Sequence, residues 1–233
     1  MLTLRLLLAA REGCDDALTG ALAEEGGRAC GLLGAGSRAL GFARIDPDPF
    51  AGQYAAPRAF EAVLAIDLPE GDERADRLID VVRGANERLA AWVQPDVSGA
   101  LIARRRRVVG EEGPLRFLYL MRHQAGSTTA AFQEHWGGPH AEFGRHTKGI
   151  LGYDQLHVDP AAARAAARVA GFGVHAVDGV PELHLASVDD FVSAAVGSET
   201  GNAAIEDEKS FVDSRNSVGF VCRQISRCTG DAQ

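Results

Sequence analysis

The feature that most constrains the fold is an alternating apolar pattern that occurs twice, once in each half of the chain. Residues 2–11 read LTLRLLLAAR and residues 115–123 read LRFLYLMRH, and aligning the two places Arg5 opposite Arg116. Alternation of this kind is typical of a β-strand with one buried face. The sequence therefore predicts an internal duplication in which each half begins with a strand.

Further elements follow in the same order in both halves. The first strand runs into a helical pattern, two strand candidates come next, and a second helix precedes a closing strand. This β-α-β-β-α-β order is the ferredoxin-like arrangement. We predict an α+β fold of two tandem ferredoxin-like repeats, residues 1–110 and 114–228, whose sheets pair. The expected strands are 2–11, 39–45, 60–68, 98–102, 115–123, 150–158, 180–186 and 218–222, and the expected helices are 15–25, 74–93, 128–147 and a segment within 189–211.

Charge and composition exclude several classes of partner. The 233 residues carry a net charge of −8, which argues against nucleic acid and anionic membranes because both are bound by clustered cationic side chains. No window approaches the roughly 20 apolar residues of a membrane span. The four cysteines show no close pairing, so we expect no disulfide framework and predict a cytoplasmic location. The expected partner is a small molecule.

Several blocks of the second half share a pattern with a known family. A strand leads through a glycine-containing turn to a helix with Phe132 and Trp136, followed by His140-Ala141 and a Gly-Tyr strand. In this order the blocks resemble the EthD family over residues 115–225, and the first half carries none of these signature residues. The blocks are 122–127 (RHQAGS), 132–136 (FQEHW), 139–141 (PHA), 152–153 (GY) with Val158, 178–183 (DGVPEL) and 207–213 (DEKSFVD).

The resemblance implies a barrel made from two sheets. In this family the barrel usually forms when two single-repeat chains dimerise; a duplicated chain has the alternative of pairing its own two repeats, so a homodimer remains open. EthD members are functionally diverse, and relatives of the fold include polyketide cyclases, decarboxylases and monooxygenases that act without a metal. Haem enzymes share the barrel too. The resemblance alone does not choose a reaction.

All seven histidines lie between residues 123 and 184, which places the expected chemistry in the second half. His140 is the sharpest candidate. Gly137, Gly138 and Pro139 should end one helix and start another, with His140 in the new first turn. The helix dipole there disfavours imidazolium, so a neutral imidazole would be available as a general acid or base. The alternative is that His140 hydrogen-bonds a backbone carbonyl and fixes the kink.

Strand alternation supplies a second group of candidates. The apolar face of each second-half strand should pack on the helices, so its mixed face should line the barrel. That reasoning predicts an interior holding Arg122, Tyr153, His157, Glu182 and His184, suited to a planar, oxygenated or anionic substrate. Tyr153 or His157 would complement His140, and Arg122 would stabilise a carboxylate or enolate. The alternative is that these side chains face outward and are solvated.

Other patterns carry less. Trp136 and Phe132 share one helical face, which favours core packing over a ligand platform, although Trp136 is kept as a substrate-binding candidate. Residues 34–39 (GAGSRA) fit a dinucleotide loop in form, but no helix follows. Arg104–Arg107 is interpreted as a solvated strand end. The histidines match no known metal spacing, so neither a metal nor a cofactor is expected.

The leading functional hypothesis is a cofactor-independent enzyme that acts on a small aromatic, polyketide-like or carboxylated metabolite. Proton transfer through His140 would promote cyclisation, dehydration or decarboxylation, and a cofactor-free monooxygenase belongs to the same class. One alternative is a barrel that binds a small ligand without catalysis. The other is a haem protein in which His157 or His184 is the iron ligand.

Overall fold

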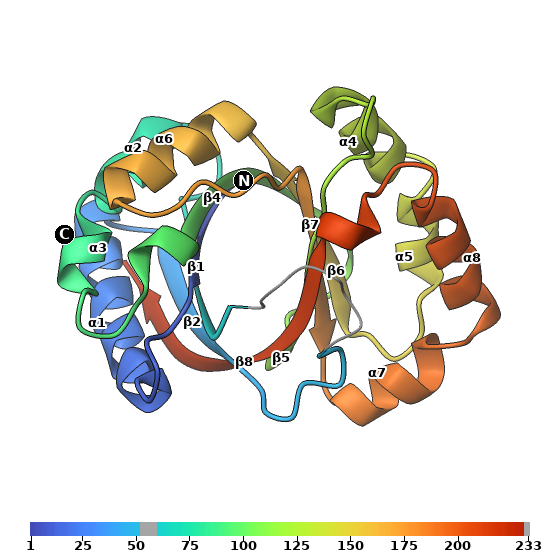
Figure 1. The fold of residues 1–233 in the computed structure, drawn as a ribbon, viewed down its shortest axis with the longest axis horizontal. Helices are drawn as coiled ribbons and strands as arrows, with labels where there is room; N and C mark the ends of the chain where they lie inside the picture. Colours follow the sequence, from blue (N-terminus) through green and yellow to red (C-terminus); the bar gives the residue numbers. More distant parts are fainter. Residues whose placement is uncertain (52–59, 231–233) are drawn as a thin grey trace.

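The chain folds into one closed antiparallel barrel (Figure 1). The computed structural model describes residues 1–51 and 60–230. Going round the barrel, the strands follow the order β1-β3-β2-β8-β5-β7-β6-β4. Their bounds are β1 (Leu2–Leu8), β2 (Arg38–Arg44), β3 (Ala62–Asp67), β4 (Gly99–Gly110), β5 (Leu115–Leu120), β6 (Gly152–Val158), β7 (Gly179–Leu185) and β8 (Val218–Thr229).

Each half contributes a ferredoxin-like sheet. The first gives the order β4-β1-β3-β2 and the second β8-β5-β7-β6, and the seams are the β2–β8 and β4–β6 pairs. The predicted fold class is confirmed, and the barrel closes within a single chain. Division into domains 1–110 and 114–228 stays a prediction. The closing strands β4 and β8 are longer than expected, and β4 includes the run Arg104–Arg107, whose side chains pair with carboxylates or a backbone carbonyl.

Helices cover the outside of the barrel. Two of the predicted long helices are interrupted: one at Gly84, which has a positive φ of 65°, and one at Gly138 and Pro139. Among the described residues, no helix is long and apolar enough to cross a membrane. The bounds are α1 (Asp15–Leu33), α2 (Ala75–Val81), α3 (Ala85–Arg88), α4 (Thr129–Gly137), α5 (Ala141–His146), α6 (Pro160–Ala170), α7 (Val188–Ala195) and α8 (Glu199–Glu208).

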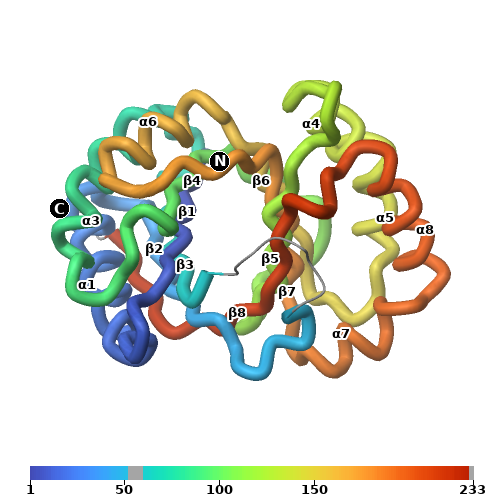
Figure 2. The backbone as a smooth tube through the Cα atoms, viewed as in Figure 1, coloured from blue at the N-terminus to red at the C-terminus, as the bar shows by residue number. Residues whose placement is uncertain are grey.

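Helix α6 is absent from the sequence prediction. Asp159 caps it by accepting hydrogen bonds from two backbone N–H groups, Pro160 occupies its first turn, and Gly171 ends it with a left-handed conformation. Its buried alanines belong to the core of the first half. The helix itself lies over β4 and beside α2 (Figure 2). A helix inserted between β6 and β7 thus covers the sheet of the other repeat and links the two.

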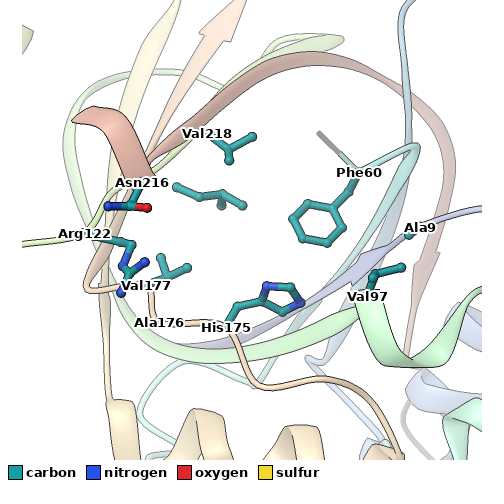
Figure 3. A pocket seen from close by; sticks show the side chains of 10 residues that line it. Ala9, Phe60, Val97, Arg122, His175, Ala176, Val177, Asn216 and Val218 are labelled. Carbon is teal, nitrogen blue, oxygen red and sulfur yellow. The ribbon is translucent and has the colours of Figure 1, made fainter. Parts of the chain in front are cut away.

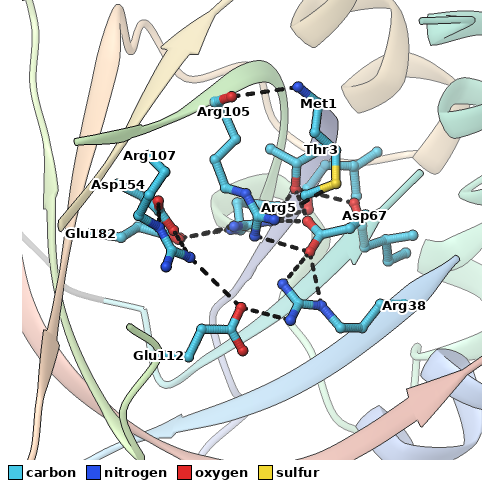
Figure 4. Close-up of polar contacts among 12 residues, drawn as sticks. Met1, Thr3, Arg5, Arg38, Asp67, Arg105, Arg107, Glu112, Asp154 and Glu182 are labelled. Atoms are coloured by element: carbon cyan, nitrogen blue, oxygen red, sulfur yellow. Dashed lines mark hydrogen bonds and ion pairs between the residues drawn. The ribbon is translucent and has the colours of Figure 1, made fainter. Parts of the chain in front are cut away.

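The barrel interior is apolar at its centre and charged at one end. Alternate residues point inward, among them Leu7, Phe42, Leu118 and Phe220. Beyond them lies a group that we call the charged cluster, consisting of Arg5, Asp67, Asp154, Glu182 and His184, all buried. Figure 4 shows the first four of these residues. Within it, Arg5 donates two hydrogen bonds to Glu182, from Nε to Oε1 over 2.7 Å and from Nη2 to Oε2 over 3.0 Å.

Further arginines neutralise the remaining acids of the charged cluster. Asp67 accepts from Arg38 and Arg105, and Asp154 accepts from Arg107 and from Nε2 of His184 at 3.0 Å. Burial would raise the pKa of Asp67, but the surrounding guanidinium groups hold it well below its usual value. Burial would likewise raise the pKa of Asp154, but hydrogen bonds from His184 and Arg107 lower it to about 2. The acids stay ionised, and this end of the barrel is closed by paired charges.

The Arg5–Glu182 pair gives a test of the fold. Replacing Glu182 by Gln leaves the buried Arg5 without its main counter-charge, which should destabilise the protein by about 3–5 kcal/mol. Glu206→Gln is the matched control, because Glu206 forms only an exposed pair with Lys209. Urea unfolding of both variants measures the difference. Equal stability of the two variants would show that the pair does not hold the barrel together.

Candidate functional site

A pocket of about 200 Å³ lies outside the barrel, between the second-half sheet and helices α5, α7 and α8. Its walls are largely aromatic and aliphatic, and it includes His140 from the turn before α5 and Glu208 from the end of α8. The other lining residues are Phe117, Tyr119, Met121, Trp136, Phe143, Gly144, Thr147, Tyr153, Pro181, Leu183, Phe191, Ala195, Val196, Gly201, Ala204 and Ile205.

The break between α4 and α5 positions His140. Helix α4 ends at Gly137, α5 begins at Ala141, and His140 occupies the intervening cap position without capping the helix through its side chain. The new helix therefore starts two residues later than Pro139 suggested. The Nδ1 atom of His140 lies 2.7 Å from Oδ2 of Asp207 on α8. The imidazole therefore bonds a carboxylate and not a backbone carbonyl, which was the alternative interpretation.

The environment keeps His140 neutral and fixes its tautomer. Burial lowers the pKa of His140, partly offset by Asp207. The expected direction was correct, but desolvation rather than the helix dipole is the largest cause. Asp207 also lies 3.0 Å from Nε2 of His135. Desolvation would raise the pKa of Asp207, but the hydrogen bonds from His135 and His140 lower it. Because Asp207 is ionised, Nδ1 of His140 carries the hydrogen, which leaves Nε2 to accept a proton.

A second titratable group, Glu208, stands beside His140. Its Oε1 lies 3.7 Å from Nε2 of His140, and its side chain is 26% exposed at the pocket edge. Withdrawal from water, reinforced by the adjacent Asp207 carboxylate, raises the pKa of Glu208 to about 7. Glu208 is therefore able to exchange a proton near neutral pH, beside a His140 ring whose pKa burial lowers.

Two hydrogen-bond donors face the same space. Burial raises the pKa of Tyr153 above its usual value, so its hydroxyl stays protonated, and that oxygen accepts from Nε2 of Gln155 at 3.0 Å. Nε1 of Trp136 is buried, and among the described residues it has no hydrogen-bond acceptor. Gly144 of α5 is required at its position because any Cβ there would overlap the Tyr153 ring. Trp136 and Tyr153 thus bring an indole N–H and a phenol O–H to the pocket wall.

The prediction that the candidate residues line a single cavity inside the barrel is wrong for the candidates on strand β6. Its inward residues are Asp154, Leu156 and Val158, whereas Tyr153 and His157 point outward beneath the helices. The alternation was correct but its phase was not, because polar residues occur on both faces. Asp154 is satisfied inside by Arg107, and outside Nε2 of Gln155 donates to the carbonyl of Trp136 at 2.9 Å.

The remaining candidates are divided between other places. Glu182 and His184 point inward as expected, but they belong to the charged cluster. Arg122 lines the opposite end of the barrel. His157 packs on Trp136 with ring centroids 4.8 Å apart, and burial with the nearby Arg106 lowers the pKa of His157 to about 4. Only His140, Tyr153 and Trp136 share the pocket.

Three residues of the charged cluster have a spacing that a metal ion could bridge. Ligand atoms of Asp154, Glu182 and His184 lie within 4.8 Å of one another, a spacing that a metal ion fits. The carboxylates, however, already bind Arg107 and Arg5. Neither His157 nor His184 lines the pocket. The geometry of these residues therefore lends no support to a haem or metal centre there.

Sequence reasoning missed Asp207 and Glu208 as site residues. Both belong to the block DEKSFVD at 207–213, which carries the family resemblance, and that block was the available signal. Their proximity to His140 depends on α8 packing beside α5, which no local pattern specifies. In the sequence, two adjacent carboxylates at the end of a helix look like a solvated surface, and only the packing of the fold withdraws Glu208 from water.

Comparisons with known proteins agree with this architecture. Residues 124–215 match the EthD domain, which confirms the resemblance for the second half. No curated protein matches the chain. Among solved structures, an anthrone oxidase-like protein aligns with a TM-score of 0.62 at 10% identity, over 97% of this chain and 92% of that one.

Two further solved structures carry the printed name "putative monooxygenase". The one from Lactobacillus acidophilus NCFM has a TM-score of 0.52 at 10% identity, with coverage of 100% and 97% of the two chains. The one from Fusobacterium nucleatum has a TM-score of 0.53 at 8% identity, with coverage of 100% and 95%. At such identities the likeness establishes the fold, which is that of the dimeric α+β barrels.

The raised pKa of Glu208 is directly measurable. A carbon-detected NMR titration should show this carboxyl changing charge near pH 7, with the signal identified by its loss in Glu208→Gln. Asp207→Asn should lower that pKa without restoring the ordinary value, because burial is the larger cause. Complete titration of Glu208 below about pH 5 would contradict its desolvation.

Proposed function

We propose that the chain is an enzyme that removes a proton from a small, planar, enolisable aromatic ketone of polyketide type. The observation that supports this most is the buried His140–Asp207 pair at the wall of an apolar, aromatic pocket. Aromatic walls suit a flat ring system, and a neutral imidazole with an oriented Nε2 suits abstraction of a weakly acidic C–H or O–H proton.

The base acts with help from its neighbours. Nε2 of His140 takes the proton, and the imidazolium that forms is stabilised by Asp207 across the 2.7 Å hydrogen bond. Glu208 stands close enough to exchange the proton onward or to return it, and its pKa of about 7 matches that task. General acid–base catalysis is most effective when the pKa lies near the working pH.

The oxygen of the substrate gains negative charge as the proton leaves. Trp136 Nε1 and the Tyr153 hydroxyl are the pocket donors available to that oxygen. In apolar surroundings a donor fixed in advance stabilises an enolate more strongly than water does. Tyr153 thereby keeps a part in the chemistry, whereas Arg122, the enolate stabiliser expected from sequence, lies outside this pocket.

We favour direct reaction of the enolate with O₂ as the next step, in keeping with the anthrone oxidase-like name of one structural neighbour. For an anthrone, the ring CH₂ and one O₂ give the quinone carbonyl and one H₂O, so the substrate is oxidised and O₂ is reduced. The same proton abstraction would also begin a cyclisation or dehydration. The cytoplasmic location stays a prediction. The homodimer also stays a prediction, because the barrel closes without a second chain.

Substitution of His140 tests the proposal. With 1,8-dihydroxyanthrone, the wild-type protein should accelerate both exchange of the CH₂ hydrogens in D₂O without O₂ and quinone formation in air. His140→Gln should slow the exchange by about 10²- to 10⁴-fold, because a general base is lost. NMR measures the exchange, and absorbance measures the quinone.

His146→Gln is the matched control, since His146 lies on the same helix, exposed and bonded only to the carbonyl of Glu142. It should retain the wild-type rates. Exchange catalysed equally by His140→Gln would remove His140 from the mechanism. Exchange without quinone formation in air would keep the base and exclude the oxygenase step, favouring cyclisation or dehydration.

A further inference from the structure

A second and larger cavity, of about 430 Å³, lies at the end of the barrel where β1 and β5 end, opposite the charged cluster. The packed apolar core that includes Leu7, Leu118 and Phe220 separates the two ends. A molecule bound in this cavity would therefore rest against an apolar floor.

The walls of this cavity combine an apolar lining with a cationic rim. Leu120, Val177 and Val218 continue the barrel interior outward, while Phe60 packs edge-on to His175 with centroids 5.3 Å apart. Figure 3 shows Arg122 and Asn216 on one wall, facing Phe60 and Val97 across the space. The polar groups Arg122 and Asn216 thus lie on one wall, and Phe60 and Val97 form the apolar wall opposite.

Arg122 is the charged group of this rim. Among the residues that the structure describes, no carboxylate lies within ion-pair distance of its guanidinium, in contrast to the paired arginines of the charged cluster. The nearby acids are engaged elsewhere: Asp213 accepts from Asn216 at 2.7 Å, and Asp178 accepts from His123 and Thr129. A half-buried guanidinium beside an apolar cavity favours an anionic group that brings its own apolar body.

We infer that the barrel mouth is a binding site for an amphipathic monocarboxylate, with its apolar chain against Leu120, Val177 and Val218 and its carboxylate on Arg122. Asn216 offers a further donor at the same wall. The cavity shares no lining residue with the His140 pocket, because the two lie on opposite faces of the sheet. The inference is independent of the reaction proposed for that pocket.

Calorimetric titration with decanoate, and with decanol as a neutral probe of the same chain length, tests the site. Wild-type protein should bind decanoate with a Kd below about 1 mM. Arg122→Gln should weaken decanoate binding by about 10- to 100-fold, the worth of a charge-assisted hydrogen bond, and leave decanol binding unchanged. Arg215→Gln is the matched control, since Arg215 is exposed near the mouth without lining it.

Two further variants locate the chain of the ligand. Val218→Trp should fill the barrel mouth and remove binding of both probes, whereas Ala204→Phe, in the His140 pocket, should change neither. Absence of decanoate binding to the wild type, or equal affinity in Arg122→Gln, overturns the inference. So does loss of binding in Ala204→Phe with retention in Val218→Trp, which would place the ligand at the His140 pocket.

Discussion

The bidentate contact between Arg5 and Glu182 is the interaction on which the rest of the barrel depends. It crosses the interior from β1 of the first half to β7 of the second, joining residues 177 positions apart. Burying either charge alone would cost several kcal/mol, so the pair is stable only in a register that brings both strands to the same depth. That requirement fixes how the two repeats meet.

The duplicated architecture is used unequally by the two halves. Outside the first-half sheet, Leu18 and Leu22 of α1 pack with Leu64 and Ile66 into a filled core, supplemented by α6 from the other repeat. Outside the second-half sheet, helix α4 is broken at Gly138 and the space under α5 and α8 stays open. The first repeat therefore has a filled core beneath its helices, and the second keeps a pocket beneath its helices.

Local patterns in the sequence predicted the elements but not their neighbours. The alternation that marks β5, with Phe117 and Tyr119 outward and Leu118 inward, was interpreted correctly because one face is wholly apolar. On β6 polar residues occupy both faces, so the pattern gave the period without the phase, and Tyr153 was assigned to the wrong side. Helix α6 was missed although Asp159-Pro160 is a helix start. The role of Glu208 could not be predicted from local patterns, because its raised pKa arises from the packing of α8 beside α5.

The apolar character of the His140 pocket serves binding and acidity together. Desolvation disfavours the charged form of every group, so it lowers the pKa of His140 and raises that of Glu208. The pKa of Glu208 is thereby brought to about 7 and His140 is kept neutral, while Asp207 remains ionised through its hydrogen bonds from His135 and His140. Access of water to the pocket would remove the desolvation that shifts the pKa values of His140 and Glu208. The apolar walls that keep water out of this pocket therefore also set the protonation states of His140 and Glu208.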